Sequence, residues 1–496
     1  MSDLLLIPIA ILYLIVVSLL FVYGINFFYL TILSFRRTAA APPPPPENWP
    51  LVTVQLPIFN ERYVARRLIR AAAALDYPAG LLEIQVLDDS VDETRAIVAE
   101  TVADLGRSGV EIVQLHRSDR QGYKAGALAA GMEAARGEFL AIFDADFIPT
   151  RDFLKRTVPE FADPGVAFVQ TRWGHLNRDY SILTLLQSIA IDAHFMVEQF
   201  ARFKSGYWFN FNGTAGIWRK TAIAAAGGWK AVTLTEDLDL SYRAFLNGWR
   251  GVYLRDVEVQ AELPVTFSAY RRQQRRWAQG SLECALELTP KVWAQPIPIA
   301  KKIEASLHLT GYAIHILLFI LAVLYPAIVV ISRQYPSLSS LFGIAIIFNL
   351  TAFAPTIFFI AAQKQLGENW WRKIPATLFI TALGTGMMLN TVQSALNILT
   401  GKAPIFERTP KFGIAARGDS WRRKAYQLKL DPIVLFELGF ALYNLNTVLY
   451  ALRSGTWIVA VHAGIFTVGL LFAAIITIAQ GLFVRKTEME RASTGD

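Results

Sequence analysis

Cysteine is almost absent from this chain, because Cys284 is the only one among 496 residues. A single thiol cannot form an intramolecular disulfide, and it excludes a zinc site built from several cysteines. The part of the chain outside a membrane therefore need not face an oxidising compartment. The chain also lacks an internal repeat of the length that indicates a solenoid.

Charged residues are missing from the first long segment, Leu4 to Phe35. This segment is longer than the roughly 20 residues that a helix needs to cross a bilayer. A secretory signal would carry basic residues before a short apolar core, whereas Arg36 and Arg37 follow the apolar run here. We therefore predict that residues 1–37 form an uncleaved transmembrane anchor with its C-terminal end in the cytosol.

The basic balance of the chain has a membrane explanation. The net charge is +8 and 53% of the residues are hydrophobic, with most basic residues flanking long apolar runs. This is the positive-inside pattern of membrane proteins, in which Lys and Arg concentrate in cytosolic segments. We therefore expect a lipid bilayer as a partner and exclude nucleic acid.

Apolar runs return in the second half of the chain, beyond Lys301 and Lys302. The basic residues at Lys364 to Lys373 and at Arg408 to Lys429 can all be cytosolic only if Ile374 to Leu399 enters and leaves the membrane on one side. We therefore predict a re-entrant or interfacial helix there and five spans in total, with a sixth true span as the alternative. The four spans expected after the anchor are Ala305 to Ile331, Leu341 to Ala362, Ile433 to Leu452 and Trp457 to Val484.

A few polar side chains fall inside these predicted spans. For His308, His315 and His462 we favour a buried, hydrogen-bonded role over a polar channel lining. Glu437 lies near the start of a span, where it either lines a path through the membrane or reaches the membrane interface.

An unbroken proline run at Pro42 to Pro46 marks a boundary, because it favours a stiff polyproline spacer and cannot continue a helix. It divides the anchor from a segment with the composition of a soluble domain. The expected domains are a Pro-rich linker at 38–50, a catalytic domain at 51–290, a transmembrane region with interfacial helices at 291–486, and a cytosolic tail at 487–496.

Within residues 51–290, short β-branched runs alternate with amphipathic stretches such as Arg62 to Leu75 and Lys124 to Ala135. This alternation is typical of a mostly parallel α/β sheet. The clearest strands are Val52 to Leu56, Ile84 to Leu87, Ile112 to Leu115, Phe139 to Phe143 and Val166 to Gln170.

Carboxylates follow two of these strands directly: Asp88 and Asp89 after the second, Asp144 and Asp146 after the fourth. Ligands of an open α/β sheet bind outside the carboxyl ends of its strands, so both pairs are expected to face one crevice. The Asp144-Ala145-Asp146 spacing suits Mg²⁺ or Mn²⁺ with open positions for diphosphate oxygens. An isolated Asp-X-Asp is more often a solvated turn, but its place after a buried strand favours a site.

Thr235-Glu236-Asp237 forms a third acidic cluster. An inverting transfer needs one base that removes the proton of the acceptor hydroxyl as its oxygen attacks the anomeric carbon. The alternative is a helix start, with Thr235 as the N-cap and acidic residues in the first turn. Both interpretations can hold for the same segment.

The next motif is Gln273-Gln274-Arg275-Arg276-Trp277. It contains arginine, a permanent cation that can bind a phosphate, and tryptophan, an aromatic ring on which a sugar can stack. A basic stretch ending in Trp can equally be an interfacial membrane anchor. The motif stands between the soluble segment and the next predicted span, where both roles fit.

These motifs, in this order and spacing, resemble the signature of processive family 2 glycosyltransferases, which include cellulose, hyaluronan and mannan synthases. The resemblance runs from Leu56 to Glu61 through the downstream spans. Phe211 to Arg219 and Leu234 to Tyr242 look closest to plant cellulose-synthase-like mannan and glucan synthases. The resemblance to this family implies an α/β GT-A (Rossmann-like) cytosolic catalytic domain inserted between transmembrane helices.

The resemblance also implies roles for individual residues, with Asp237 as the catalytic base beside Glu236. Asp144 and Asp146 would bind the metal, and a gating loop at about 404–413 would close over the donor through Thr409 and Lys411. The implied donor-binding residues are Pro57, Glu61, Asp88, Asp89, Lys124, Asp144, Gln273 and Arg276. The implied acceptor-binding residues are Phe211, Asn212, Gly213, Thr214 and Trp277.

The expected activity is inverting, processive transfer of a hexose from UDP-glucose or GDP-mannose to the end of a growing β-glycan that leaves through the membrane. The location would be a plasma, inner or Golgi-type membrane. The alternative is a non-processive enzyme with a lipid acceptor, of the ceramide glucosyltransferase type; a transporter or receptor would leave the acidic clusters unexplained. The chain departs from the cellulose synthase pattern in two ways. We expect a single span before the catalytic domain, and no domain after the spans that would bind a cyclic dinucleotide. We therefore do not expect a cyclic dinucleotide messenger to control this protein. Accessory subunits and homo-oligomers stay open.

Overall fold

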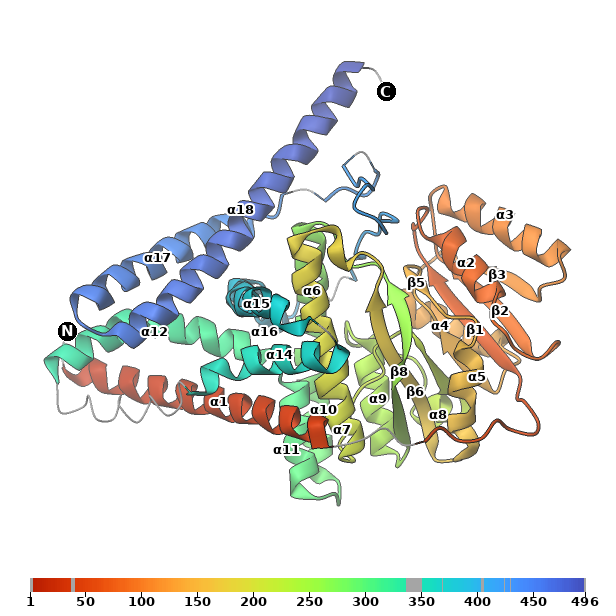
Figure 1. The fold of residues 1–496 in the computed structure, drawn as a ribbon, viewed down its shortest axis with the longest axis horizontal. Coiled ribbons are helices and arrows are strands. Elements are labelled where there is room, and N and C mark those ends of the chain that lie inside the picture. The colour runs from red at the N-terminus through yellow and green to blue at the C-terminus, as the bar shows by residue number, and fades with distance from the viewer. Residues whose placement is uncertain are drawn as a thin grey trace.

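The computed structural model describes residues 3–36, 41–335, 350–367, 369–402, 406–422, 424–428 and 430–494, with side chains described from 7 to 484. A mixed sheet with helices around it forms one end of the molecule, and long apolar helices form the other (Figure 1). The sheet order is β3-β2-β1-β4-β7-β6-β8-β5. The strands are β1 (Val52–Ile58), β2 (Leu82–Asp88), β3 (Ile112–His116), β4 (Phe139–Ile142), β5 (Phe147–Ile148), β6 (Val166–His175), β7 (Gly216–Arg219) and β8 (Arg250–Ala261).

One half of the sheet is parallel, with β1 between β2 and β4 and with β3 at the edge. Strands β1 and β4 are buried almost throughout, as expected for continuous apolar runs covered on both faces. The crossovers are α2 (Ala65–Ala73), α3 (Thr94–Arg107) and α4 (Tyr123–Ala134). Both predicted helical stretches and the predicted strands of this half are confirmed.

The other half corrects the expectation of a mostly parallel sheet. Strand β7 is antiparallel to both β4 and β6, and β5 is antiparallel to β8, so only β6 and β8 pair in parallel there. The predicted strand at Val166 to Gln170 is confirmed as the start of β6, whereas β5, β7 and β8 were not predicted. Sequence periodicity does not reveal the direction in which a short strand such as β7 enters a sheet.

Further helices surround this sheet. A continuous helical segment is made of α6, a π-helical turn η3 and α7, and it contacts β6 and β8 on one side and the apolar helices α1 and α14 on the other. The bounds are α5 (Phe153–Thr157), η1 (Val158–Ala162), η2 (Arg178–Tyr180), α6 (Ile182–Ala193), η3 (His194–Gln199), α7 (Phe200–Lys204), α8 (Lys220–Ala225) and α9 (Glu236–Leu246).

Helix α10 (Phe267–Ala294) joins the two ends of the molecule. Its N-cap Thr266 accepts a hydrogen bond from the backbone N–H of Ala269 at 3.3 Å. The helix contacts α9 at the sheet end and α16 and α18 at the apolar end. The domain boundary expected after residue 290 falls inside this helix.

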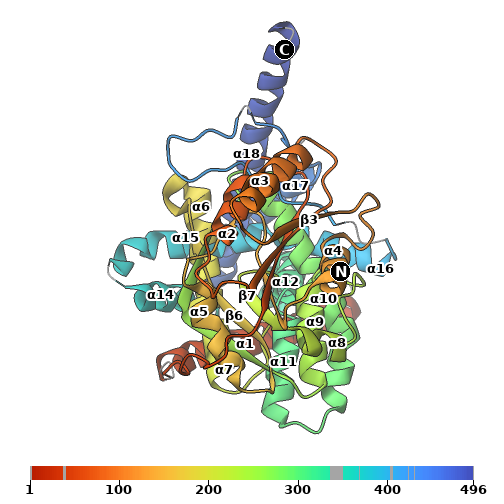
Figure 2. The same cartoon turned by 90° about the vertical axis from the view of Figure 1, so that its right-hand side faces the viewer.

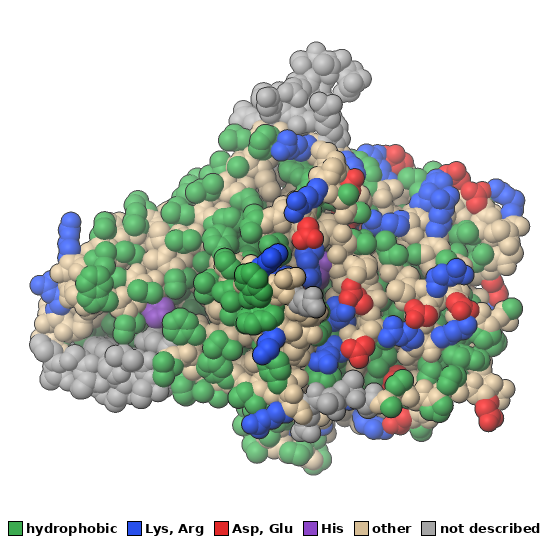
Figure 3. Space-filling view, viewed as in Figure 1, with side chains coloured by type: hydrophobic (Ala, Val, Ile, Leu, Met, Phe, Trp, Pro, Cys, Tyr) green, Lys and Arg blue, Asp and Glu red, His purple; other side chains and the backbone are tan. Residues whose placement is uncertain are grey.

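Five stretches of the described chain are long and apolar enough to cross a membrane: Ile7–Arg36, Ala313–Gln334, Trp370–Leu399, Ile433–Arg453 and Trp457–Val484. Hydrophobic side chains cover this end of the molecule, whereas Lys, Arg, Asp and Glu cover the sheet end (Figure 3). The helices are α1 (Asp3–Arg36), α11 (Ile299–Leu309), α12 (Ala313–Gln334), η5 (Leu350–Phe353), α14 (Ala354–Leu366), η6 (Trp370–Lys373), α15 (Ile374–Gly386), α16 (Met388–Leu399), α17 (Ile433–Arg453) and α18 (Trp457–Thr494).

These helices differ from the predicted spans at three places. The span expected at Ala305 to Ile331 is broken between α11 and α12. The one expected at Leu341 to Ala362 lies partly outside the described residues, because 336–349 are not among them. The segment Ile374 to Leu399, predicted to be re-entrant or interfacial, consists of α15 and α16 and lies within a stretch that is long and apolar enough to cross a membrane; α15 runs across the direction of α1 and α12 (Figures 1 and 2).

Ion pairs fasten α10 to the apolar helices. The fully buried Arg271 donates through Nη2 to both Glu437 carboxylate oxygens at 2.9 Å and to Thr477 at 3.0 Å. Arg275, one turn on, donates to Asp431 at 2.8 Å. Glu437 thus neither lines an open path nor reaches the interface, since 1% of its side chain is exposed.

We predict that Glu437→Leu strongly destabilises the protein, by about 3–5 kcal/mol, because it leaves a buried guanidinium without its counter-charge. Thermal unfolding in detergent micelles measures this. Leu435→Ala, at a 70% exposed position of the same helix, is the control and should change the stability by about 0.5 kcal/mol or less. Equal melting temperatures for both variants would contradict the role of the pair.

Candidate active site

A cleft of about 160 Å³ opens where the carboxyl ends of β1, β2 and β4 meet the start of α9 and the first half of α10. Its position follows the rule that open α/β sheets bind ligands beyond the carboxyl ends of their strands. The sequence-predicted residues that line it are Pro57, Glu61, Asp89, Lys124, Asp144, Asp146, Asn212, Gly213, Glu236, Asp237, Gln273, Arg276, Trp277, Thr409 and Lys411.

Each aspartate of the Asp144-Ala145-Asp146 motif contacts a lysine ammonium. Lys124 Nζ lies 2.5 Å from Asp144 Oδ1, and Lys411 Nζ lies 2.6 Å from Asp146 Oδ2. Burial lowers the pKa of Lys124, but Asp144 and Glu236 raise it by more, so its pKa lies above its usual value. Asp144 and Asp146, which follow one strand, therefore form ion pairs with lysines from two distant parts of the chain.

The residues present fit a divalent cation. The carboxylate oxygens of Asp144 and Asp146 line the cleft, each contacts a lysine ammonium group, and such hard oxygens are the ligands that Mg²⁺ and Mn²⁺ prefer. The described residues contain no cluster of three or more His, Cys, Asp or Glu able to hold a metal. Asp144 and Asp146 would thus share the cation with oxygens of a bound ligand, as Mg²⁺ and Mn²⁺ sites with few protein ligands do.

Asp237 lies in the first turn of α9, and its Oδ1 accepts from the Leu238 N–H at 2.9 Å. Burial, together with the neighbouring charge of Glu236, raises the pKa of Asp237 to about 7. Thr235 occupies the N-cap position, but its side chain makes no capping hydrogen bond and instead lies 3.5 Å from Cys284 Sγ. The acidic first turn is thus confirmed, while the side-chain cap is absent.

Gly213 forms the wall opposite Asp237. Its φ is +78°, and a Cβ atom there would lie 2.9 Å from Asp237 Oδ2 and 3.4 Å from Lys124 Nζ. Its carbonyl oxygen accepts a hydrogen bond from Lys124 at 2.9 Å. Only glycine tolerates both this backbone conformation and this approach to the carboxylate.

The Gln273 to Trp277 motif is divided by the helical period of α10. Gln273, Arg276 and Trp277, spaced three and four residues apart, line the cleft. Gln274 and Arg275 face the other way, where Gln274 accepts from Tyr312 at 3.2 Å and Arg275 donates to Asn390 at 3.1 Å. Burial lowers the pKa of Arg276, and the negative charges of Glu236 and Asp144 offset only part of that lowering. One motif therefore both lines the cleft and contacts the apolar helices.

The loop after α16 covers the cleft; residues 406–413 of the expected gating loop are described, and 404 and 405 lie outside the described residues. Phe406 stacks on Tyr123 with 5.6 Å between ring centroids, and the Arg276 guanidinium lies 4.5 Å from the Phe406 ring. Arg408 donates to the Asn60 carbonyl. The Thr409 hydroxyl is buried without a partner among the described residues.

Three predicted residues do not line the cleft. Asp88 is fully buried, and each of its carboxylate oxygens has a partner in the protein: it accepts from the Ser90 N–H at 2.9 Å and from Gln114 at 2.7 Å. Phe211 packs in the core, and the Thr214 hydroxyl accepts from the Asp144 N–H at 2.8 Å. They support the cleft walls from behind.

The structure also adds cleft residues that the sequence did not reveal. Glu262 directly follows β8, its carbonyl oxygen accepts a hydrogen bond from Lys411 at 2.7 Å, and burial raises the pKa of its carboxyl group. Trp173 and His175 end β6, and Arg120 precedes α4. For Glu262 and His175 the signal existed, since both are polar residues at strand ends, but β8 and the length of β6 were not predicted.

Glu61 lies at the entrance, 3.9 Å from Arg408. Burial raises its pKa to about 7, which Arg408 opposes and which Asp146 and Asp144 reinforce. Asp89 lies nearby and pairs through both oxygens with Arg117, at 2.8 and 2.6 Å. Glu61, whose pKa is raised, and the hydrogen-bonded Asp89–Arg117 pair thus both border the cleft.

Two family profiles match the chain. The profile described as "Glycosyltransferase like family 2" matches residues 49–280, and the one described as "Cellulose synthase" matches residues 215–491. Together they cover the cleft and the apolar helices.

Curated relatives include a probable glucomannan 4-beta-mannosyltransferase 7 from Oryza sativa subsp. japonica, 46% identical over 51% of this chain and 44% of that protein. Glucomannan 4-beta-mannosyltransferase 2 from Arabidopsis thaliana is 48% identical over 47% of this chain and 45% of that protein. The aligned part of the chain thus spans less than half the length of these relatives.

Among solved structures, the mannosyltransferase PcManGT from Pyrobaculum calidifontis, in complex with GDP-Man and Mn²⁺, is similar in fold. It covers 80% of this chain and 100% of its own, with a TM-score of 0.54 and 20% identity. The likeness supports the GT-A fold expected from the sequence.

We predict that Lys411→Met tightens Mn²⁺ binding to the nucleotide-free protein about tenfold, because the ammonium and the metal compete for Asp146 and a charge-assisted contact is worth about 1.5–3 kcal/mol. Titration of Mn²⁺ followed by electron paramagnetic resonance measures the affinity. Lys402→Met, at an exposed position near the same loop, should leave it unchanged. Equal affinities in the Lys411 variant and the unaltered protein would refute the competition.

Proposed function

The chain belongs to the cellulose synthase family, and on that premise we propose that it is a hexosyltransferase, namely an inverting, processive β-glycosyltransferase that elongates a mannan or glucomannan. The observation that carries this proposal is the cleft itself. Its lining includes a buried carboxyl group with a pKa near 7, Asp237, together with the Asp144 and Asp146 pair and the Trp277 side chain.

We propose GDP-mannose as the donor, with UDP-glucose as the second choice. The names of the plant relatives and the GDP-Man bound to the archaeal structure support this choice. Lys124, Gln273 and Arg276 line one wall of the cleft as donors of hydrogen bonds and positive charge, which suits a diphosphate. Glu61 and Asp89 at the entrance would contact the nucleoside.

In the proposed reaction, Asp237 takes the proton of an acceptor hydroxyl whose oxygen forms a bond to the anomeric carbon. The bond from that carbon to the diphosphate breaks, and the nucleoside diphosphate leaves toward Lys124 and Arg276. A divalent cation held by Asp144 and Asp146 would neutralise the diphosphate charge. Attack from the face opposite the leaving group makes the new linkage β when the donor linkage is α.

The acceptor is proposed to lie against Trp277; Trp173, His175 and Pro264 also line the cleft. Aromatic planes bind sugar faces through apolar contact and still allow sliding. Because α10 carries Trp277 and also contacts the apolar helices, a growing chain would leave the cleft toward the membrane. The predicted acceptor contacts at Asn212 and Gly213 border the same space.

We also propose that the catalytic domain is cytosolic. Basic residues gather where the apolar helices meet it, including Lys301, Lys302, Arg372 and Lys373. Figure 3 shows blue side chains along this junction. The positive-inside rule places such a junction on the cytosolic side of the membrane.

The test of the function is a donor screen on purified protein in nanodiscs with Mn²⁺. GDP-mannose should yield a long product that a β-mannanase degrades, while UDP-glucose gives less. A single sugar attached to an extracted lipid would replace this proposal with a lipid-acceptor enzyme. Turnover of neither donor would refute both.

We predict opposite effects for two aspartates of α9. Asp237→Asn should lower kcat by at least about 10²-fold, the loss expected when a general base is removed. It should also raise the melting temperature at pH 8, because it replaces a buried carboxylate whose folded-state pKa lies above its unfolded value. Binding of GDP with Mn²⁺ checks that the nucleotide site is intact.

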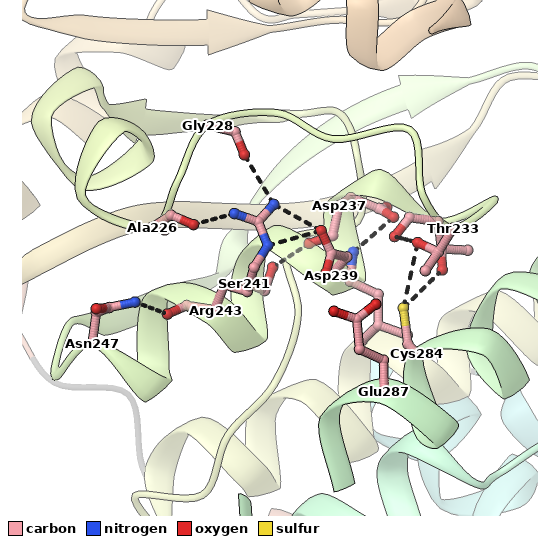
Figure 4. A network of polar contacts seen from close by, with 12 residues as sticks. Ala226, Gly228, Thr233, Asp237, Asp239, Ser241, Arg243, Asn247, Cys284 and Glu287 are labelled. Carbon is pink, nitrogen blue, oxygen red and sulfur yellow. Dashed lines mark hydrogen bonds and ion pairs between the residues drawn. The ribbon is translucent and has the colours of Figure 1, made fainter. Parts of the chain in front are cut away.

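Asp239→Asn is the matched control. Asp239 is not among the residues that line the cleft; it pairs with Arg243, which also donates to Gly228 (Figure 4). Its loss should lower the melting temperature and leave the kcat of the folded protein within about threefold. Retained turnover in Asp237→Asn would remove Asp237 from the role of base.

The rate of the unaltered protein should fall about tenfold per pH unit below pH 7, since only the carboxylate form of Asp237 accepts a proton and its pKa is about 7. A Glu61→Gln variant distinguishes Asp237 from Glu61, whose pKa is also about 7. The descending limb should persist in that variant. A rate independent of pH between 5 and 7 would contradict the assignment.

A further inference from the structure

A π-helical turn, η3 (His194–Gln199), faces the loop that forms one wall of the cleft. It lies between α6 and α7, where these contact β6 and β8 on one side and α1 and α14 on the other. A π-turn places one extra residue in a helical turn, and such turns recur at functional sites. Here three polar side chains of the turn, His194, Glu198 and Gln199, form contacts around Asn212.

The backbone N–H and both ends of the side-chain amide of Asn212 have partners in the protein. Its backbone N–H donates to Gln170 at 2.7 Å, and its Oδ1 accepts from Gln199 Nε2 at 2.5 Å. Its Nδ2 lies 3.0 Å from His194 Nε2. The Asn212 amide is therefore held on both sides by residues of one helical turn.

The hydrogen bonds specify where the His194 proton lies. Gln199 Nε2 donates to both the Asn210 carbonyl at 2.9 Å and Asn212 Oδ1, so Gln199 cannot turn its amide over without losing both bonds. Asn212 must then present its NH₂ group to His194 Nε2, which has to be an unprotonated acceptor. The proton of the neutral imidazole lies on Nδ1.

The proton on His194 Nδ1 has a hydrogen-bond acceptor in the Glu198 carboxylate. His194 Nδ1 lies 2.8 Å from Glu198 Oε2, and Arg202 pairs with the other oxygen of the same carboxylate. Arg202 is 2% exposed and also faces Glu304 of α11 at 3.7 Å. A histidine whose one nitrogen is oriented by a carboxylate presents the other nitrogen in a fixed direction.

The next residue connects this network to the reacting groups. Gly213 accepts from Lys124 through its carbonyl and borders Asp237 Oδ2, so its position depends on how Asn212 is held. We propose that His194, oriented by Glu198, is a positioning residue that holds the Asn212 to Gly213 wall against Lys124 and Asp237. This inference rests on the proposed transfer reaction and adds a residue that touches no substrate.

The test compares variants of His194 in full-length protein in nanodiscs with GDP-mannose and Mn²⁺. His194→Phe removes the acceptor for Asn212 and should lower kcat about 30-fold, because a misplaced wall shifts the reacting groups. His194→Gln keeps an acceptor oxygen at the distance of Nε2 and should retain kcat within about threefold. Met196→Leu, a volume-conserving change at a buried position of the same turn, is the control and should match the unaltered protein.

All rates are divided by the fraction of protein that binds GDP with Mn²⁺. A purely structural role would lower that fraction in both His194 variants and leave the normalised kcat unchanged. An equal normalised kcat in His194→Phe and the unaltered protein would overturn the proposal while the transfer function stands.

A second measurement does not depend on turnover. In protein labelled with ¹⁵N-histidine, solid-state NMR at pH 7.5 should show His194, assigned through the His194→Gln variant, as the neutral tautomer protonated on Nδ1. Glu198→Gln should change this signal. A His194 protonated on Nε2, or on both nitrogens, would overturn the network even if no donor were turned over.

Discussion

The concentration of carboxylates in one partly buried cleft is the constraint on which the rest of this structure depends. Asp144, Asp146, Glu236 and Asp237 meet within reach of each other's charge, and burial makes each uncompensated charge costly. Lys124, Arg276 and Lys411 come from α4, α10 and the loop after α16 to offset that charge. Distant segments of the chain are thus held together by the same charges that suit the cleft to a metal and a diphosphate.

Helix α10 carries this constraint into the apolar half of the molecule. Its cleft face bears Arg276 and Trp277, and its other face bears Arg271 and Arg275, whose partners Glu437 and Asp431 lie at the start of α17. A movement of α10 would disturb both sets of contacts, because a helix of 28 residues transmits displacement along its length. Chemistry in the cleft and passage of a polymer toward the membrane are therefore mechanically linked in the proposed function.

The site was predictable where it depends on short motifs at the ends of strong elements. Asp144 and Asp146 follow a fully buried strand, and Asp237 opens a helix, so the local sequence already indicates an exposed strand end and an acidic first turn. Asp88 shows the limit of this reasoning. Asp88 is the last residue of β2, and Asp89 follows it. Successive residues of a strand face opposite sides, so only Asp89 lines the cleft, while Asp88 accepts a hydrogen bond from Gln114 of the neighbouring strand.

By itself, the sequence determined the alternation of strands and helices, the acidic motifs and the long apolar segments, because hydrophobic periodicity and charge scarcity are local properties. The tertiary structure alone decided that β7 runs antiparallel, that α10 crosses the expected domain boundary, that Glu262 and His175 line the cleft, and that the π-turn at His194 contacts Asn212. These features depend on contacts between residues far apart in the chain, and no local pattern of residue types encodes which distant partner a side chain meets.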